Sequence, residues 1–465
     1  MKTTFLVSRL SRIASAAIAL SLVTPGSAYG QAKDPGPRPI RANPNIPPMV
    51  SGASANDAAL FSMALKSFLQ FYSVDGTMVS PTGIAFPNVG LGPRFNHFDC
   101  SSCHRIPFAG GSSYSTNSQA LLNGNVGTDY GNQAPGQVAP PFLKNAGPTL
   151  AARLKYKPDG TRDGSVHQVW TIAGRPDAPG CNIQQTDWVA ELAKNNVAIR
   201  ITTPTFGAGY IEAISDAAIV GNKNSFVAQK VQLGISGHEN RNTLDGSISK
   251  FGWKAQTRTL NDFSADAFVN EMGVTNAKFQ SENDPTPGCN FHAGVEDPLV
   301  ATPNGPMSNT DLVSHFMRFL AQPAPVPPTT SINNGKTLFS NIGCIGCHTP
   351  SFTTPPDAAP AVFANKPVPL YSDLLVHHMG PNLADDIIQG QAQGDEFRTA
   401  PLWGIGQRYY FLHDGRTSDL RAAIDAHASA ASGGFVASEA NAVVAKWTAL
   451  TETQKQDLLN FLRGL

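Results

Sequence analysis

The sequence predicts a mainly α-helical chain with long irregular loops and a few short strands, arranged as two related modules. The pattern C-x-x-C-H occurs twice, at residues 100–104 and 344–348, and each copy follows a segment with helical periodicity. A second pattern also recurs, because residues 203–209 (TPTFGAG) match residues 400–406 (APLWGIG), each behind its own C-x-x-C-H. Glycine and proline are abundant, at 42 and 36 of 465 residues, which favours long connections between short helices.

Apolar residues at three- and four-residue spacing predict the main helices. Residues 57–71 form the helix before the first C-x-x-C-H, and residues 331–339 form a shorter helix before the second. Further helices are predicted at residues 263–272, 309–321, 420–427 and 451–463, the last ended by Gly464. Alternating apolar residues predict two short strands, at 168–172 and 197–201.

C-x-x-C-H is the attachment signature of c-type haem. Two thiols add across the vinyl groups of haem, and the adjacent histidine becomes the proximal ligand of the iron. A redox dithiol or half of a zinc site is the alternative for a single copy, and two copies argue against it. We therefore expect two cytochrome c-like haem domains, the first enlarged by insertions. The covalently bound haems are held by Cys100, Cys103 and His104, and by Cys344, Cys347 and His348.

The N-terminus has the features of a secretory signal peptide. Lys2, Arg9 and Arg12 precede an apolar run at 13–23, and small residues then lead to a predicted cleavage before Gln31. The run is too short to span a bilayer, which takes about 20 apolar residues, so we expect no membrane span in the mature chain. Covalent haem attachment takes place outside the cytoplasm. We therefore expect the chain in the periplasm of a Gram-negative envelope.

Charge and cysteine content narrow the class of protein further. Lys plus Arg equals Asp plus Glu, at 34 each, so no bulk charge attracts nucleic acid or an anionic membrane. Four of the six cysteines belong to the two C-x-x-C-H motifs, which leaves Cys181 and Cys289. In an oxidising compartment these two are predicted to form one disulfide, and two separate buried thiols are the alternative.

The motifs and the proline content divide the chain into five segments. Residues 1–30 are the predicted signal peptide, and residues 31–55 are a proline-rich arm. The N-terminal haem c domain with its insertions is placed at 56–322. A stiff proline-rich linker at 323–330 leads from it into the C-terminal cytochrome c domain at 331–465.

Several longer stretches point to one family. They are FN at 95–96, FGAGYIEAI at 206–214, FGWKAQ at 251–256, EMG at 271–273, YSDLLVH at 371–377, MGP at 379–381, RTAPLWG at 398–404 and FLHDGR at 411–416. In this order they resemble the bacterial di-haem oxidoreductase family, often labelled thiol oxidoreductases, over roughly residues 57–465. That family is related to the di-haem cytochrome c peroxidases, the di-haem maturation enzyme of methylamine dehydrogenase and the haem-c rubber oxygenases. No free reactive cysteine pair supports thiol oxidation here.

For the second haem the resemblance implies a distal ligand at His427. In related peroxidases a ligand, commonly methionine, follows the equivalent of residues 413–416 at the same interval. Histidine on both faces gives a haem a lower potential than Met/His ligation. The resemblance also places His413 beside this haem, near a propionate or the path between the haems. Arg416 is a candidate propionate partner, because guanidinium matches a carboxylate bidentately. Purely structural roles are the alternative for all three residues.

The first haem is predicted to keep one open face. No histidine or methionine occurs between His104 and Asn145, the region where peroxidases with a displaceable histidine have that ligand. An iron with an open face binds peroxide or dioxygen, whereas a saturated iron conducts electrons. His167, His238 and His292 are the alternative ligands for this face.

Two further residues are predicted to serve the chemistry. Glu212 is the candidate acid/base for peroxide, because it lies in an apolar stretch directly after the repeated pattern and peroxide cleavage needs a proton carrier. An ion pair or a helix start is the alternative for Glu212. The resemblance implies a tryptophan relay between the haems, for which Trp253 is the first candidate and Trp403 the second, with core packing as the alternative.

We therefore expect a peroxidase-like, periplasmic di-haem c-type oxidoreductase. It reacts with peroxide or dioxygen at the N-terminal haem and passes electrons through the C-terminal haem to or from a periplasmic donor or acceptor. A haem-c oxygenase that cleaves an apolar substrate and a non-catalytic di-haem electron carrier are the alternatives. Related peroxidases hold calcium between their domains, but the chain has no dense acidic loop that supports such a site.

Overall fold

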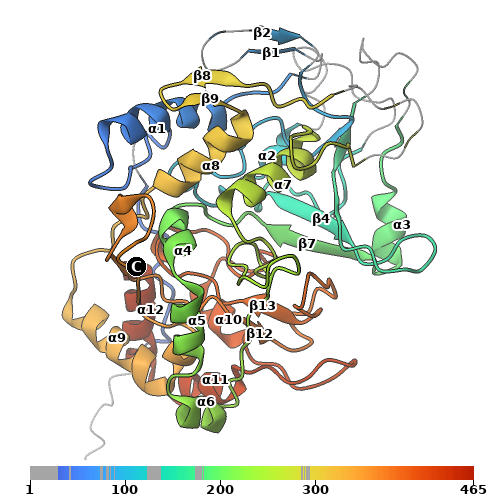
Figure 1. Cartoon of the computed structure of the whole chain (residues 1–465). Helices are drawn as coiled ribbons and strands as arrows, with labels where there is room; N and C mark the ends of the chain where they lie inside the picture. The colour runs from blue at the N-terminus through green and yellow to red at the C-terminus, as the bar shows by residue number, and fades with distance from the viewer. Residues whose placement is uncertain are drawn as a thin grey trace, which may run out of the picture.

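The computed structural model describes residues 30–40, 43–73, 77–79, 83, 85–87, 89–122, 138–172, 181, 183–283, 286, 289 and 294–465. The predicted signal peptide up to residue 29 and His292 lie outside the described residues. Within them the chain is mostly helical with a few short strands, which confirms this part of the predicted fold class (Figure 1). No helix in the described part of the chain is long and apolar enough to cross a membrane.

The N-terminal half combines a group of helices with one small sheet. Helix α8 (Asn309–Phe319) packs against both α1 (Ala55–Phe68) and α7 (Leu260–Met272). Strand β4 (Leu150–Leu154) pairs antiparallel with β5 (Val166–His167) and β7 (Val197–Ile201). The shorter helices are α2 (Ser118–Leu121), α3 (Trp188–Ala193), α4 (Ala208–Ala213), α5 (Asp216–Lys223) and α6 (Val227–Leu233). The two-stranded pairs are β1 (Thr77–Val79) with β2 (Ala85–Pro87), β3 (Arg94–Phe95) with β6 (Trp170–Thr171), and β8 (Val300–Thr302) with β9 (Gly305–Met307).

The C-terminal half is built on two crossing helices, α9 (Thr330–Ile342) and α12 (Glu452–Gly464). They cross closely at Gly335, where an added Cβ would lie 2.0 Å from the carbonyl oxygen of Asp457. Short helices α10 (Leu420–Asp425) and α11 (Asn441–Thr448) complete this half (Figure 1). Its remaining elements are η1 (Cys344–Gly346), η2 (Ala361–Phe363), η3 (Ile405–Gln407), β10 (Phe352–Thr353), β11 (Pro367–Val368), β12 (Val376–His378) and β13 (Glu396–Arg398).

Local sequence signals fix where the predicted helices begin and end. Helix α1 begins two residues before the predicted start, because Ser54 and Asp57 form a capping box. Helix α9 runs on to Ile342 and ends at Gly343, which adopts a left-handed conformation with φ 105°. The strand predicted at 197–201 is confirmed as β7, whereas only two residues of the stretch predicted at 168–172 form a strand, β6.

The recurring pattern of the sequence corresponds to two segments that pack against each other. Gly207 and Gly404 both have φ 72°, a conformation that favours glycine. An added Cβ at Gly207 would lie 2.5 Å from Trp403, and one at Gly404 would lie 2.7 Å from Phe206. Each aromatic residue of one copy thus covers the glycine of the other copy.

The two copies also occupy the same place relative to the last long helix of their halves. An added Cβ at Gly209 would lie 2.1 Å from the carbonyl oxygen of Arg318 on α8, and one at Gly406 would lie 2.1 Å from that of Arg463 on α12. Helix α8 in the first half therefore corresponds to α12 in the second.

Two large hydrophobic clusters form the core, and both draw on distant parts of the chain. The first contains residues of α1, α7 and α8 together with Phe352, Phe363 and Leu375. The second contains residues of α9 and α12 together with Ala32, Leu233 and Ile235. In Figure 1 the run α4–α5–α6 extends from the first half down to the second, where α6 contributes Leu233. The proline-rich arm likewise reaches the second half through Ala32.

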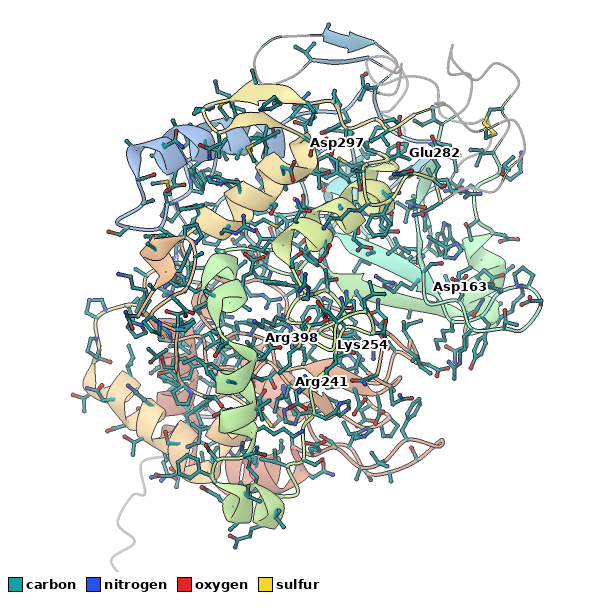
Figure 2. All side chains as sticks on the ribbon, viewed as in Figure 1. Asp163, Arg241, Lys254, Glu282, Asp297 and Arg398 are labelled. Atoms are coloured by element: carbon teal, nitrogen blue, oxygen red, sulfur yellow. A yellow bond between two sulfur atoms is a disulfide. The ribbon has the colours of Figure 1, made fainter. Side chains whose placement is uncertain are left out.

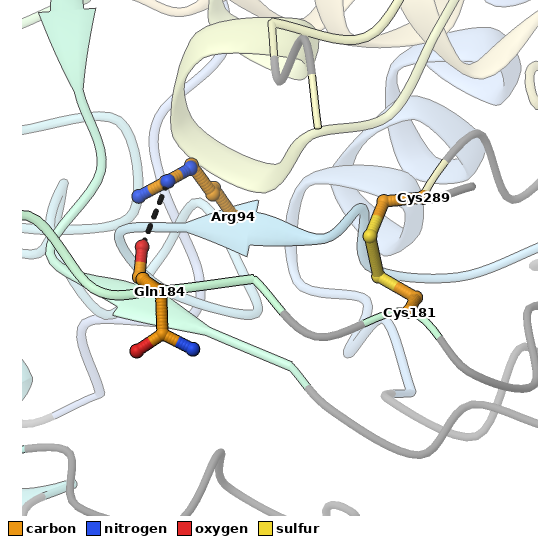
Figure 3. The surroundings of a disulfide bond; sticks show 4 residues. All are labelled: Arg94, Cys181, Gln184 and Cys289. Carbon is orange, nitrogen blue, oxygen red and sulfur yellow. Dashed lines mark hydrogen bonds between the residues drawn. A yellow bond between two sulfur atoms is a disulfide. The ribbon is translucent and has the colours of Figure 1, made fainter. Parts of the chain in front are cut away.

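The predicted disulfide between Cys181 and Cys289 is confirmed (Figure 3). The two sulfur atoms join segments that are 108 residues apart in the sequence. Nearby, Nη2 of Arg94 donates to the carbonyl oxygen of Gln184 at 2.8 Å, which ties the same segment to β3.

Candidate functional site

The second C-x-x-C-H lies at a cavity of about 220 Å³ that is lined mainly by apolar side chains. Cys344, Cys347 and His348 line it from η1 and the turn that follows. His427 also lines it, just after α10, where Leu420, Ala423 and Ile424 present the same helix face. The cavity therefore contains the predicted proximal and distal histidines of one haem.

Three histidines share one hydrogen-bond arrangement that suits iron ligation. Nδ1 of His104 lies 3.2 Å from the carbonyl oxygen of Gly111, that of His348 lies 2.9 Å from Tyr371, and that of His427 lies 2.7 Å from Ala423. A backbone carbonyl only accepts, so Nδ1 carries the proton and Nε2 keeps its lone pair for a metal. Burial lowers the pKa of His104 and His348 to about 4, so both rings are neutral at pH 7.

Two buried arginines at the second cavity have N–H groups without an acceptor among the described residues. They are Arg398, at Nη1, and Arg408, at Nε and Nη2, and both line the cavity. Arg398 lies near the middle of the molecule (Figure 2). Burial lowers the pKa of each to about 10, so each remains charged. A buried cation needs a partner. Haem has an apolar ring and two propionates, so it fits an apolar cavity lined by these two arginines.

The first C-x-x-C-H lies at a different cavity, of about 170 Å³, in the N-terminal half. The cavities at the first and second motifs are called the first and second cavity. Cys100, Cys103 and His104 line it, and helix α7 forms one wall. Its lining is more polar than that of the other cavity and includes Arg153, whose Nε has no acceptor among the described residues. These features fit a haem with a polar pocket beside it.

Glu271, at the end of α7, is a partly buried carboxyl group at the first cavity. Its Oε2 accepts from Nδ2 of Asn96 at 2.7 Å. Burial raises its pKa, and this outweighs the lowering effects of the Asn96 hydrogen bond and of Arg153. Asp266, five residues earlier on α7, also lines the cavity and has a pKa raised by burial. A carboxyl group with a raised pKa in a polar pocket can carry a proton to and from a bound oxidant.

Trp253 connects the two cavities. It lines both of them, and it also lines a third, smaller cavity formed by the two copies of the recurring pattern. Its Nε1–H donates to the carbonyl oxygen of Ile201 at 2.9 Å, which fixes the indole ring. His413 packs edge-on against it, with ring centroids 6.3 Å apart. The side chain therefore lies between the places predicted for the two haems.

Comparison with known proteins identifies the family. Residues 150–465 match the family described as "Di-haem oxidoreductase, putative peroxidase". The chain belongs to this di-haem oxidoreductase family. The match contains the second C-x-x-C-H, His427, Glu271 and Trp253, and it begins after the first C-x-x-C-H. Membership implies two haems and an oxidoreductase activity of peroxidase type.

Solved structures similar to this family member share little sequence with it. A MauG-like protein associated with microbial copper homeostasis is 18% identical over 56% of this chain and 89% of its own, with a TM-score of 0.29. The di-haem peroxidase BthA from Burkholderia thailandensis is 14% identical over 46% of this chain and 65% of its own, with a TM-score of 0.27. Hydrazine synthase from Kuenenia stuttgartiensis is 17% identical over 35% and 57%, with a TM-score of 0.23. No curated protein matches the chain.

Glu212 does not line either of the cavities that contain the C-x-x-C-H motifs. Its carboxylate accepts from Nε of Arg318 at 2.8 Å and from the backbone N–H of Leu260 at 2.9 Å. The ion pair considered as the alternative is therefore formed. This position gives no support to the predicted role of Glu212 as the proton carrier, and Glu271 replaces it as the candidate.

Arg416 also lies away from both cavities. Its side chain is partly exposed and donates to Asp414 and to the carbonyl oxygen of Asn382. This position does not support a propionate contact, for which Arg398 and Arg408 are the better candidates. The signal for Arg398 was present in the sequence, because this residue begins the family stretch RTAPLWG.

The other histidines considered are accounted for by local partners. His413 lines the second cavity and stacks on Phe397 with ring centroids 4.1 Å apart, and burial lowers its pKa to about 4. His167 pairs with Asp163, and His238 pairs with Glu396. Neither of these two lines the first cavity.

The four cysteines of the motifs form no disulfide in the structure. Burial raises the pKa of all four thiols. A thiol held neutral in this way is a poor nucleophile toward disulfides. The arrangement is compatible with addition to haem vinyl groups and unlike that of a thiol oxidoreductase.

Proposed function

We propose that the chain is a periplasmic di-haem c-type peroxidase. It takes two electrons from a periplasmic donor and uses them to reduce peroxide at the N-terminal haem. The observation that supports this most directly is that the two cavities have different linings and share one residue. His348 and His427 both line the second cavity, the partly buried acid Glu271 lines the first, and Trp253 lines both.

Each haem, when bound, supplies an iron that changes its oxidation state. In this proposal Cys100 and Cys103, and Cys344 and Cys347, would hold the two rings covalently, and the adjacent histidines would each bind an iron. His427 would be a further ligand of the second iron through Nε2, which its hydrogen bond to Ala423 leaves free. A saturated second haem is suited to electron exchange, because it leaves no position for an oxidant.

Glu271 handles the protons at the first haem. When the haem is bound, Glu271 would take a proton from one oxygen of peroxide and deliver it to the other oxygen, which leaves as water. For this it must be ionised when peroxide arrives. Asn96 and Arg153 favour the ionised form, while burial opposes it, which keeps the pKa above the usual carboxyl range. The carboxyl group is thereby able both to accept a proton and to release it.

Trp253 passes electrons between the two sites in this proposal. Its indole N–H donates to a carbonyl oxygen, which cannot take up a proton, so the ring keeps its proton while charge passes through it. Arg398 and Arg408 pair with haem propionates next to this path. The proposed periplasmic location rests on the predicted signal peptide and on the predicted covalent attachment of haem, which takes place outside the cytoplasm.

The experiment is a comparison of wild type and His427→Ala by paramagnetic resonance and by rapid mixing with hydrogen peroxide. We expect wild type to contain two c-type haems and to react with peroxide, and His427→Ala to convert one haem from low to high spin. Two saturated haems with no peroxide reaction would leave a non-catalytic electron carrier. An unchanged spectrum in His427→Ala would overturn the ligand assignment.

A further inference from the structure

Among the described residues, the same hydrogen-bond arrangement is found in each half of the chain, beside the helix that forms a wall of the cavity at the C-x-x-C-H motif. In each half, one carboxylate joins an arginine of the last long helix to the first backbone N–H of the cavity helix. The two carboxylates are Glu212 and Asp34, which lie far apart in the sequence and belong to different segments.

In the first half the carboxylate is that of Glu212. Its Oε2 accepts from Nε of Arg318 on α8 at 2.8 Å. Its Oε1 accepts from the backbone N–H of Leu260, the first residue of α7, at 2.9 Å. Helix α7 then presents Phe263, Asp266 and Glu271 to the first cavity.

In the second half the carboxylate is that of Asp34, on the N-terminal arm. Its two oxygens accept from Nε and Nη2 of Arg463 on α12, at 2.6 and 2.7 Å. Oδ2 also accepts from the backbone N–H of Leu420, the first residue of α10, at 2.8 Å. Arg463 and Asp34 are almost completely buried, with side chains 3% and 7% exposed, so this pair is shielded from water and from salt.

The two arrangements are equivalent by position as well as by chemistry. Arg318 and Arg463 occupy corresponding places, because their carbonyl groups contact Gly209 and Gly406 of the recurring pattern. Three residues after Gly209 the first half has Glu212, but three residues after Gly406 the second half has Tyr409. Helix α4 is also reduced there to the single turn η3. The second half therefore lacks a carboxylate of its own at this point.

Hydrogen bonds hold the N-terminal arm in place, so that Asp34 supplies the missing carboxylate. The backbone N–H of Ala32 donates to Glu452 on α12 at 2.7 Å, and that of Arg38 donates to the carbonyl oxygen of Gly406 at 2.7 Å. Nη2 of Arg38 donates to the carbonyl oxygen of Leu465 at 2.9 Å. These contacts surround Asp34 on both sides in the sequence.

We propose that Asp34 and Glu212 are equivalent positioning residues, each fixing the helix that forms a wall of one haem cavity. Asp34 sets the start of α10 and thereby the place of His427, seven residues later. Glu212 sets the start of α7 and thereby the place of Glu271. The first backbone N–H groups of a helix have no partner within the helix. Thr259 and Asp419 accept from later N–H groups of the first turn of α7 and α10, which leaves the N–H groups of Leu260 and Leu420 to the outside carboxylates. The part that concerns His427 rests on the proposed ligation of the second haem.

The test compares Asp34→Asn, Glu212→Gln and the surface control Asp245→Asn in the haem-loaded protein. Asp245 forms an exposed ion pair with Arg258 and lies outside both cavities. The readouts are the spin state of each haem by paramagnetic resonance and the hydrogen exchange of the amides of Leu260 and Leu420. The amide of asparagine or glutamine keeps one acceptor oxygen, so its NH2 group must face either the arginine or the helix N–H, and one of these hydrogen bonds is lost. Loss of the acceptor at a helix start corresponds to about fivefold faster exchange of that amide.

We expect each variant to affect only its own half. Asp34→Asn lowers the low-spin signal of the second haem and speeds exchange at Leu420, while Leu260 is unchanged. Glu212→Gln speeds exchange at Leu260 and leaves the low-spin signal intact. The control changes neither. Wild-type values in Asp34→Asn, or equal effects of both variants on both halves, overturn the proposal.

Two further variants keep the test decisive if Asp34→Asn does not accumulate. Asp34→Glu keeps the carboxylate and is expected to retain the low-spin signal. Arg38→Ala loosens the arm without touching Asp34 and is expected to lose a smaller part of that signal. A wild-type spectrum in Arg38→Ala overturns the proposal. If wild type itself has no low-spin haem that His427→Ala abolishes, the proposed ligation fails instead.

Discussion

Nδ2 of Asn96 donates to Oε2 of Glu271 at 2.7 Å, while its own carbonyl oxygen accepts from the backbone N–H of Val169 at 3.0 Å. Because that oxygen is already engaged, the amide can only donate to Glu271. A donor favours the carboxylate, and burial disfavours it more strongly, so the pKa of Glu271 is raised overall. Asn96 therefore limits how far the pKa of the proposed proton carrier rises.

Replacement of Asn96 by leucine is expected to shift the pH dependence of the peroxide reaction. Glu271 acts first as a base, so the rate falls as the pH drops through its pKa. A hydrogen bond to a charged group contributes about 1.5 kcal/mol, so its loss raises this pKa by about 1 unit. The falling limb of the rate moves to higher pH by the same amount. Rapid mixing over a pH series measures it, and an unshifted profile contradicts the assignment.

Glu271→Gln is expected to remove the proton carrier while keeping the shape of the side chain. Positioned acid–base groups contribute about 10²–10⁴ to a rate, and we expect a loss in this range for the reaction with peroxide. Both haems should remain, as judged by the optical spectrum of the reduced protein. Wild-type reactivity in this variant would exclude Glu271, and Asp266 on the same wall would then be the next residue to replace.

Arg408→Gln is expected to lower the reduction potential of the second haem. Burial lowers the pKa of Arg408 to about 10, so the side chain is still charged at neutral pH. Its Nε and Nη2 have no acceptor in the described part of the chain. A buried positive charge stabilises the reduced haem, which carries one more electron. We expect a decrease on the order of 50 mV, equivalent to about 1 kcal/mol for one electron. Spectroelectrochemical titration measures it, with the exposed Arg416→Gln as a matched control that leaves the potential unchanged.

Trp253→Phe is expected to slow electron transfer between the haems without removing either. Phenylalanine fills most of the same space but is much harder to oxidise and leaves the carbonyl oxygen of Ile201 without its donor. The free energy of unfolding should fall by only about 1 kcal/mol. Reduction of one haem followed by time-resolved spectra of the other gives the rate. An unchanged rate would show that electrons do not pass through Trp253.

Replacing Cys181 and Cys289 together by alanine is expected to lower stability and leave the haem spectra intact. The disulfide closes a loop whose ends are 108 residues apart, and bonds of this kind contribute about 2–4 kcal/mol. Denaturant unfolding of the double variant measures the loss. A change in haem spin state would instead connect the disulfide to the first cavity.

The sequence was sufficient for the two C-x-x-C-H motifs, whose residues are adjacent in the chain. The capping box of α1 and the glycine that ends α9 are equally local signals, but the predicted bounds 57–71 and 331–339 missed both. The disulfide was also predictable, because only two cysteines remained once the motifs were assigned. The recurring pattern identified Gly207 and Gly404 as corresponding positions, but it did not predict that each would contact the aromatic residue of the other copy.

The sequence alone did not predict which side chains meet when they lie far apart in the chain. Glu212 and Glu271 both lie in family stretches, so the sequence does not tell their roles apart. The packing of α7 places Glu271 at the first cavity, whereas Glu212 pairs with Arg318. Arg416 and Arg408 differ in the same way, since one donates to its neighbour Asp414 and the other is buried at the cavity. The role proposed for Asp34 carried no signal, because Leu420 and Arg463 lie more than 380 residues later.

The measurement that tests this account most directly is the paramagnetic resonance spectrum of the purified, fully oxidised protein at low temperature. The account predicts equal amounts of one low-spin haem with two histidine ligands and one high-spin haem, and loss of the high-spin signal when hydrogen peroxide is added. Two low-spin haems that do not respond to peroxide would contradict it.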